Sequence, residues 1–175
     1  MRSSRRPLNP RKKVWADLLS NSPISLTAGT LNVYDLLQTY RSAGGNTQGV
    51  TVIRTLINIF WVPTTTAFNF TEQFAAGLGV SQIGVATADF DPTVKPYLDW
   101  MLNDYRANLS PVAAASTYQP SAASVFQTGS MQWDVRSRRK MEEIGDTLNF
   151  VIKQVAAVSG GVSYRLHART LLLLP

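Results

Sequence analysis

The first thirteen residues divide the chain into two parts of different physical character. They contain six cations and no acid; the cations are Arg2, Arg5, Arg6, Arg11, Lys12 and Lys13. The whole chain has 17 Lys and Arg residues against 11 Asp and Glu residues, so the remainder has eleven of each and the net charge of +6 resides in this segment. A neutral body that carries a concentrated cationic segment differs from a domain whose folded surface is itself basic.

The basic segment lacks the means to fold alone. Beyond Met1 it holds only Leu8 as a sizeable apolar residue, Pro7 and Pro10 interrupt it, and like charges oppose its compaction. We therefore expect residues 1–13 to form a flexible arm. The arm is either a solvated terminus, a nuclear-targeting run or a binder of polyanions, and charge segregation favours the last. Phosphate contacts would release counterions and would be independent of sequence, because a flexible arm presents no fixed donor pattern to base edges.

Composition excludes several classes of protein. The 175 residues suit one domain that buries a core without staples. The chain has no cysteine, so disulfides, cysteine zinc sites and thiol catalysis are excluded. Its start lacks the apolar core of a signal peptide, and no apolar run approaches the roughly twenty residues of a membrane span. We expect a soluble chain that is made in the cytosol and has no membrane partner.

Period-two alternation dominates the sequence after the arm. Residues 50–62, VTVIRTLINIFWV, are rich in β-branched and aromatic side chains. Strict alternation places Val52 on the face of Arg54, and Ile53 on the opposite face with Ile57. Further strands are predicted at residues 24–33 (with a bulge), 68–85, 131–139, 147–155 and 162–174.

Helical spacing is rarer. Residues 89–106 show the clearest helical period, because apolar residues recur there at steps of three or four. Residues 14–19 could form one helical turn, and residues 34–41 read as a short helix or turn. Residues 108–129 are low in charge and interrupted by prolines, which predicts a long surface excursion. About seven or eight strands with one intervening helix predict an antiparallel sandwich of two sheets.

The sequence offers little for catalysis or metal binding. His167 is the only histidine, lies in a predicted strand and has no GxSxG elbow to serve, so we expect a sheet-surface role for it and no catalytic residue. Asp89 and Asp91 could together bind Ca²⁺ or Mg²⁺. A helix N-terminus also attracts acids for electrostatic reasons, so a metal site here is disfavoured. No cofactor is expected, since no phosphate-binding loop is present.

A second basic run lies late in the chain and is followed directly by acids. Its cations are Arg136, Arg138, Arg139 and Lys140, and the acids are Glu142, Glu143 and Asp146. The cations either touch phosphate or pair with these acids, within the subunit or across an interface. Compensation so close in sequence favours pairing and marks the run as a possible subunit interface. The four tryptophans are expected to be core or interface anchors.

Taken together, these features resemble the coat proteins of small icosahedral viruses. RSSRRPLNPRKK matches the basic arm, PISLTAGTLNV an early strand and VTVIRTLINIFWV the next one. WDVRSRRKMEEIGDTLNFVIKQV matches a late strand pair, and VSYRLHARTLLLLP the closing strand. The chain departs from the pattern in its short arm and in the poorly delimited strands after Pro63.

The resemblance implies a mainly all-β fold, in which residues 14–175 form a single jelly-roll domain of eight strands behind the arm of residues 1–13. It also implies self-assembly into the closed shell of a virion, with the arm directed onto a DNA or RNA genome, and no enzymatic activity. The residues themselves leave two alternatives open. One is a phage head or tail subunit that forms a ring, and the other is a small nucleic-acid-binding β-domain.

Overall fold

The computed structural model describes residues 11–19, 24, 30–63, 72–81, 100–106, 129–157 and 162–175. Within these residues the chain forms eight strands and one short helix. They are β1 (Lys13–Leu19), β2 (Leu31–Asp35), α1 (Gln38–Ser42), β3 (Thr51–Pro63), β4 (Glu72–Ser81), β5 (Trp100–Arg106), β6 (Gly129–Lys140), β7 (Thr147–Ala157) and β8 (Val162–Leu173).

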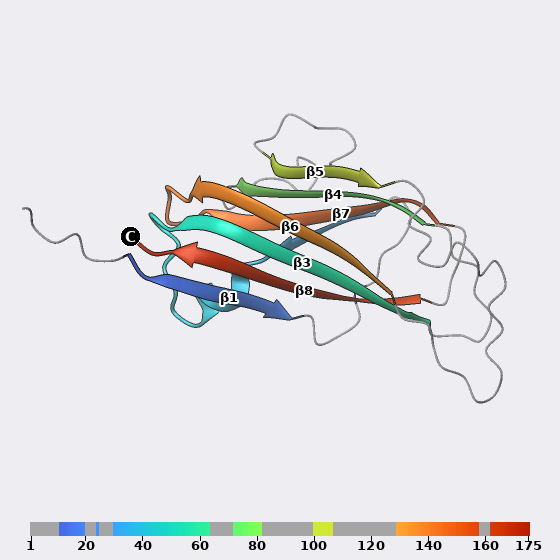
Figure 1. Ribbon diagram of the computed structural model, residues 1–175, viewed down its shortest axis with the longest axis horizontal. Helices are drawn as coiled ribbons and strands as arrows, with labels where there is room; N and C mark the ends of the chain where they lie inside the picture. The colour runs from blue at the N-terminus through green and yellow to red at the C-terminus, as the bar shows by residue number, and fades with distance from the viewer. Residues whose placement is uncertain are drawn as a thin grey trace, which may run out of the picture.

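The strands form two four-stranded antiparallel sheets that pack as layers (Figure 1). The β1 sheet has the order β1-β8-β3-β6, and the β2 sheet has the order β2-β7-β4-β5. Between the sheets the chain crosses after β1, β2, β3, β5, β6 and β7, so neighbours in space are mostly distant in sequence. Eight strands wound in this way form a jelly roll. The fold predicted from the sequence is therefore confirmed.

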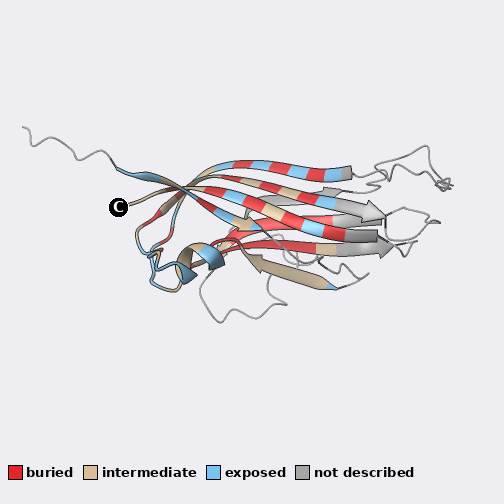
Figure 2. Ribbon diagram, turned by 90° about the horizontal axis from the view of Figure 1, so that it is seen from below, coloured by how far each residue is buried: buried red, intermediate tan, exposed pale blue. Residues whose placement is uncertain are grey.

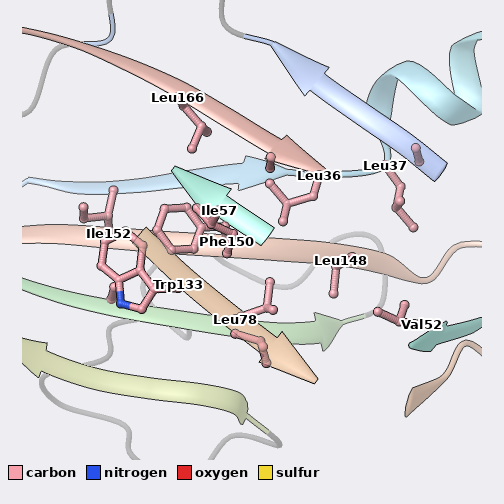
Figure 3. Packing of buried hydrophobic residues seen from close by; sticks show 14 of the residues in the cluster. Leu36, Leu37, Val52, Ile57, Leu78, Trp133, Leu148, Phe150, Ile152 and Leu166 are labelled. Atoms are coloured by element: carbon pink, nitrogen blue, oxygen red, sulfur yellow. The ribbon is translucent and has the colours of Figure 1, made fainter. Parts of the chain in front are cut away.

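The core lies between the two sheets and follows from alternation along the strands. In Figure 2 buried and exposed residues alternate along several strands. Met131, Trp133 and Val135 of β6 are buried, as predicted, and their neighbours Gln132 and Asp134 are exposed. In Figure 3 aromatic and aliphatic side chains of both sheets meet; the rings of Trp133 and Phe150 lie 5.5 Å apart at 53°. Such tilted aromatic pairs are favourable beyond their area burial.

A bulge interrupts β3 at Ile53. Val52 pairs with Leu172 and Arg139, whereas Arg54 pairs with Leu171 and Arg136, and Ile53 has no partner in either register. Val52 is fully buried, so the prediction that it shares the face of Arg54 is wrong. The extra residue reverses the alternation at this point, and spacing alone did not reveal it. Beyond the bulge the alternation is regular, and Thr55, Ile57 and Ile59 are buried on one face.

Two predicted helical segments are strands. Residues 14–19 belong to β1, where Val14, Ala16 and Leu18 face inward while β1 pairs with β8 along its whole length. Residues 100–106 form β5, which pairs with β4 from Phe74 to Gly79. In both cases pairing with a neighbouring strand overrides a local helical period. The remainder of that predicted helix, residues 89–99, lies outside the described residues.

The other predicted elements agree more closely with the structure. Strands β3, β4, β6, β7 and β8 lie within or close to the predicted ranges. The predicted helix or turn at residues 34–41 is the end of β2 followed by the single turn α1. Ile24 pairs with Tyr164 of the β1 sheet, while β2 joins the other sheet, so the predicted strand over 24–33 is divided. Residues 108–128 are not described. No helix in the described part of the chain could span a membrane.

Truncating the core should cost far more stability than truncating the surface. Phe150 is fully buried, whereas Ile144 at the β6–β7 turn is 74% exposed. We expect Phe150→Ala to lower the free energy of unfolding by about 3–5 kcal/mol, and Ile144→Ala by less than about 0.5 kcal/mol. Chemical denaturation followed by tryptophan fluorescence measures both. Equal effects of the two substitutions would contradict the placement of the core.

Candidate nucleic-acid and subunit-contact surface

The arm joins the sandwich through β1. Arg11, Lys12 and Lys13 are exposed, and the Leu174 amide donates a hydrogen bond of 2.9 Å to the Lys12 carbonyl. Pro175 lies beside them, at the end of the sandwich where β1 begins (Figure 1). Arg2, Arg5 and Arg6 lie outside the described residues, so the predicted flexibility of residues 1–10 stays a prediction.

The second basic run ends at the same end of the β1 sheet, on the opposite edge strand. The register places Lys13, Leu173, Thr51 and Lys140 in one row across β1, β8, β3 and β6. Three strand spacings separate Lys13 from Lys140, which is about 14 Å. The two basic features, far apart in sequence, therefore converge on one end of one sheet. Sequence reasoning missed this convergence, because it follows from the strand order and not from any local pattern.

The turn after the basic run has a structural acid. Asp146 is buried, and its carboxylate accepts hydrogen bonds from the backbone amides of Glu142 and Glu143, at 2.7 and 3.1 Å. Met141 accepts a bond from the Gly49 amide and donates one to the Val50 carbonyl, which joins the turn to the loop before β3. Asp146 thus holds the turn in shape by its bonds to the backbone.

A cavity of about 480 Å³ brings most of the second basic run together with the acids. Its lining is Val80 and six charged residues, namely Arg138, Arg139, Lys140, Glu142, Glu143 and Asp146. Three cations and three carboxylates leave this mixed-charge cavity with no excess of either sign. Arg136 is not part of its lining, so the structure separates one member of the predicted interface from the others.

Ion pairs occupy the outer face of the β1 sheet, the face turned away from the β2 sheet. Arg54 donates two hydrogen bonds to the Asp134 carboxylate, at 2.8 and 2.7 Å, while the Arg136 guanidinium lies 4.0 Å from it. The hydrogen bond from Arg54 lowers the pKa of Asp134, and the positive charges of Arg54 and Arg136 add to this effect. Near the opposite edge, Arg169 bonds Asp17 at 2.8 Å.

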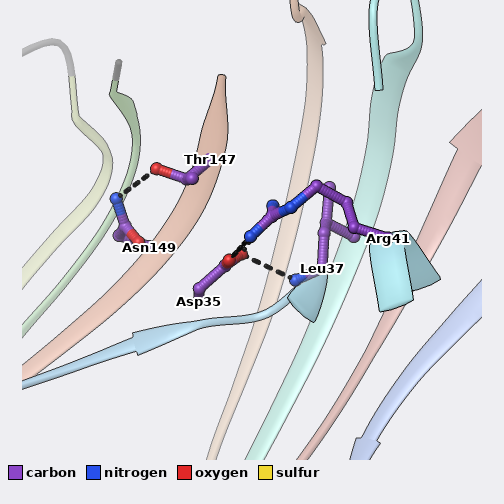
Figure 4. Close-up of polar contacts among 5 residues, drawn as sticks. All are labelled: Asp35, Leu37, Arg41, Thr147 and Asn149. Carbon is purple, nitrogen blue, oxygen red and sulfur yellow. Dashed lines mark hydrogen bonds and ion pairs between the residues drawn. The ribbon is translucent and has the colours of Figure 1, made fainter. Parts of the chain in front are cut away.

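One further ion pair stabilises the fold away from this face. Asp35 accepts hydrogen bonds from the Leu37 amide at 3.0 Å and from the Arg41 guanidinium, which also forms an ion pair with it (Figure 4). Partial burial lowers the pKa of Arg41. The contacts join the end of β2 to α1. In Figure 4 the Asn149 amide also donates to the Thr147 hydroxyl, at 2.9 Å.

The single histidine and the tryptophans occupy different environments. His167 is half-buried on the outer face, in register between Leu19 and Asn58, which agrees with its predicted place on a sheet surface. Trp133 is a core residue, as expected for an anchor. Trp15 instead lies on the outer face, 40% exposed, with the Arg169 guanidinium 5.1 Å from its ring centroid. This distance is typical of a cation–π contact.

A metal site finds no support in the described part of the chain. There, no three side chains of His, Asp or Glu gather in a way that could hold an ion. Asp89 and Asp91, the pair considered for Ca²⁺ or Mg²⁺, lie outside the described residues.

Solved structures similar to this chain are viral. One is the tobacco streak virus coat protein dimer, 12% identical, with a TM-score of 0.44 over 97% of this chain and 90% of that chain. Another is from Desmodium yellow mottle tymovirus (12% identity, TM-score 0.39, covering 98% and 93%), and a third is from turnip yellow mosaic virus (9%, 0.40, covering 100% and 87%). No protein-family model and no curated protein matches the chain. Because these TM-scores are low, the fold assignment rests on the strand order.

Replacing Arg54 should bring the pKa of the Asp134 carboxyl closer to its usual value. The native Asp134 has a pKa below the usual 3.8, so its ion pair stabilises the fold above that pH and is lost as the pH falls through the lowered value. We expect Arg54→Gln to raise the pKa of Asp134 towards 3.8. A titration of the side-chain carboxyl carbon by NMR measures it. Arg165→Gln, on the same face, serves as the control and should leave Asp134 unchanged.

Proposed function

We propose that this chain is a viral capsid protein, which assembles with its own copies into a closed icosahedral shell and packages nucleic acid through the arm. Charge placement is the observation that carries the proposal. All of the net charge is in residues 1–13, and the arm leaves the jelly roll at the end of the sheet where Lys140 also lies. A cationic segment binds a polyanion without requiring a basic body, and the six cations in and next to the arm suit phosphate neutralisation.

The fold is compatible with several functions, so the choice between them rests on particular residues. Jelly rolls serve in viral shells, in lectins and in cupins. A cupin-type metal centre requires clustered histidines and acids, and the whole chain has one histidine. The capsid function requires only surfaces that bind copies of the chain, together with a means of holding the genome.

Two features of the folded body suit contacts between copies. The mixed-charge cavity offers both signs of charge within one small surface, so it can pair with a matching surface on another subunit. Leu19 and Ile144 are 61% and 74% exposed, and large apolar side chains at such exposure are suited to interfaces. We propose Arg139, Lys140, Glu142 and Glu143 as part of the subunit contact, with Arg136 and Arg138 at its border.

Assembly and genome binding would support each other. Each arm binds the polymer weakly, but arms held in one shell meet the same polymer at a high effective concentration. Neutralised phosphates in turn repel one another less, which favours compaction of the genome. Made in the host cytosol, such a chain would reside in the virion.

Neutralising the arm should remove nucleic acid without unfolding the chain. We expect Arg2→Gln, Arg5→Gln and Arg6→Gln together to lower the nucleic acid in purified particles, and to reduce the salt dependence of single-strand binding by a slope of about 2, at about 0.7 per phosphate contact. The absorbance ratio and a salt titration measure this. The matched control replaces the same three arginines by Lys, which keeps the charge and should keep the binding. Full packaging by the Gln variant would contradict the role of the arm.

Charge reversal at the mixed-charge cavity should weaken assembly. We expect Glu142→Lys and Lys140→Glu each to reduce the fraction of closed particles, and the double variant, which restores the charge balance, to recover much of it. Light scattering and electron microscopy measure the particles, and thermal melting checks the fold. A native protein that is monomeric, or that forms open rings, would refute the shell and favour an accessory protein or a phage ring subunit.

A further inference from the structure

A groove of about 440 Å³ lies on the outer face of the β1 sheet, beside the bulge. Its lining is Ile53, Arg54, Arg136, Ser137, Arg138 and Leu171. The bulge lies between two rows of paired residues, the row of Val52 and the row of Arg54. Between these rows β8 has no further residue, β3 has Ile53, and β6 has both Ser137 and Arg138. The ladder between β3 and β6 is interrupted there, since the two strands contribute unequal numbers of residues, and the groove opens at the interruption.

The groove has an excess of positive charge. The Arg136 side chain is 78% exposed and reaches a carboxylate oxygen only at 4.0 Å, while Arg138 is exposed. Arg54 is held in place by its two hydrogen bonds to Asp134. Among the residues that the structure describes, Asp134 is the one carboxylate in an ion pair with any of these three arginines. Arg138 lines both the groove and the mixed-charge cavity, but the groove differs from that cavity because no carboxylate lines it, so it suits an anion.

The floor of the groove is apolar. Ile53, the unpaired bulge residue, and Leu171 are both half-buried and line it. Trp15 stands directly opposite Leu171 in the β1–β8 register, and side chains opposite one another project from the same face. An apolar floor edged by guanidinium groups suits a ligand with a phosphate at one end and a flat ring at the other.

We propose that this arginine groove binds one nucleotide of a single strand of nucleic acid, as a second contact in the folded body besides the arm. Arg136 and Arg138 bind the phosphate, Arg54 borders it, and the unstacked base lies on Ile53 and Leu171. A duplex keeps its bases stacked inside, so it offers the groove phosphate alone. The proposal rests on the proposed function only in taking nucleic acid as the partner. It does not require that the chain forms a shell.

The groove also lies close to the point where the arm joins the β1 sheet. The row from Lys13 to Lys140 lies two residues along β1 and β8 from the row that contains Leu171, Arg54 and Arg136. A single strand of nucleic acid that is bound by the arm therefore lies close to the groove. Its local concentration at the groove is high, which strengthens the second contact. Phosphate and stacking contacts of this kind hold a strand without reading its sequence.

Anisotropy of a fluorescent ten-nucleotide single strand, titrated with the full-length protein, tests the phosphate contact. We expect Arg136→Gln and Arg138→Gln each to weaken binding about three- to fivefold. Arg165→Gln is the matched control, since Arg165 is also exposed on the outer face, about 20 Å along β8 from Leu171. It should change affinity by less than either groove variant. Equal effects of all three substitutions would overturn the groove.

Two further strands test the base contact. An abasic strand of the same length should bind the native protein several-fold more weakly, and a duplex should compete poorly with the single strand. Equal binding of the normal and abasic strands would overturn the base contact. The Arg2, Arg5 and Arg6 Gln variant separates the two proposals. If this variant binds the single strand as tightly as the native chain does, the proposed role of the arm is refuted. If it binds weakly while the Arg136 and Arg165 variants have equal affinities, the proposed role of the groove is refuted.

Discussion

Antiparallel pairing between β1 and β8 is the interaction on which the arrangement of this molecule depends. It extends from Lys13 opposite Leu173 to Leu19 opposite His167, and the Asp17–Arg169 ion pair reinforces it. Without this pairing β1 would have no place in the sheet, and the arm would have no fixed point of departure. The pairing also brings Trp15 beside Leu171, which is one of the residues that line the arginine groove.

Charge is distributed in three ways in this chain, and each suits a different contact. The arm carries cations without acids, the mixed-charge cavity carries equal numbers of both, and the arginine groove has a modest positive excess. A flexible cationic segment attracts a polyanion at long range but does not fix its orientation. Arginines at fixed positions beside apolar side chains can orient a bound nucleotide at short range. In the proposed function, this combination would let a body with balanced charge help to hold a polyanion.

The sequence predicted those elements whose side chains follow one period without interruption. The final strand and β6 alternate between apolar and polar residues, so their range and buried face were both predicted correctly. β1 and β5 were mistaken for helices, because their short apolar patterns fit either period and only the neighbouring strand decides between them. The bulge at Ile53 and the convergence of Lys13 with Lys140 arise from register, which a single sequence does not contain. The groove was missed for this reason.

The β1–β8 pairing also has a consequence for the order of folding. Asp17 and Arg169 are 152 positions apart, so β1 leaves the ribosome long before the strand that it pairs with. Contacts of such separation form slowly, because a long loop must close before they stabilise anything. The β1 sheet therefore stays incomplete until β8 has been made, and β1 lacks its pairing partner during that interval. A nascent chain thus carries its cationic segment for some time before the β1 sheet, at whose end that segment lies, is complete.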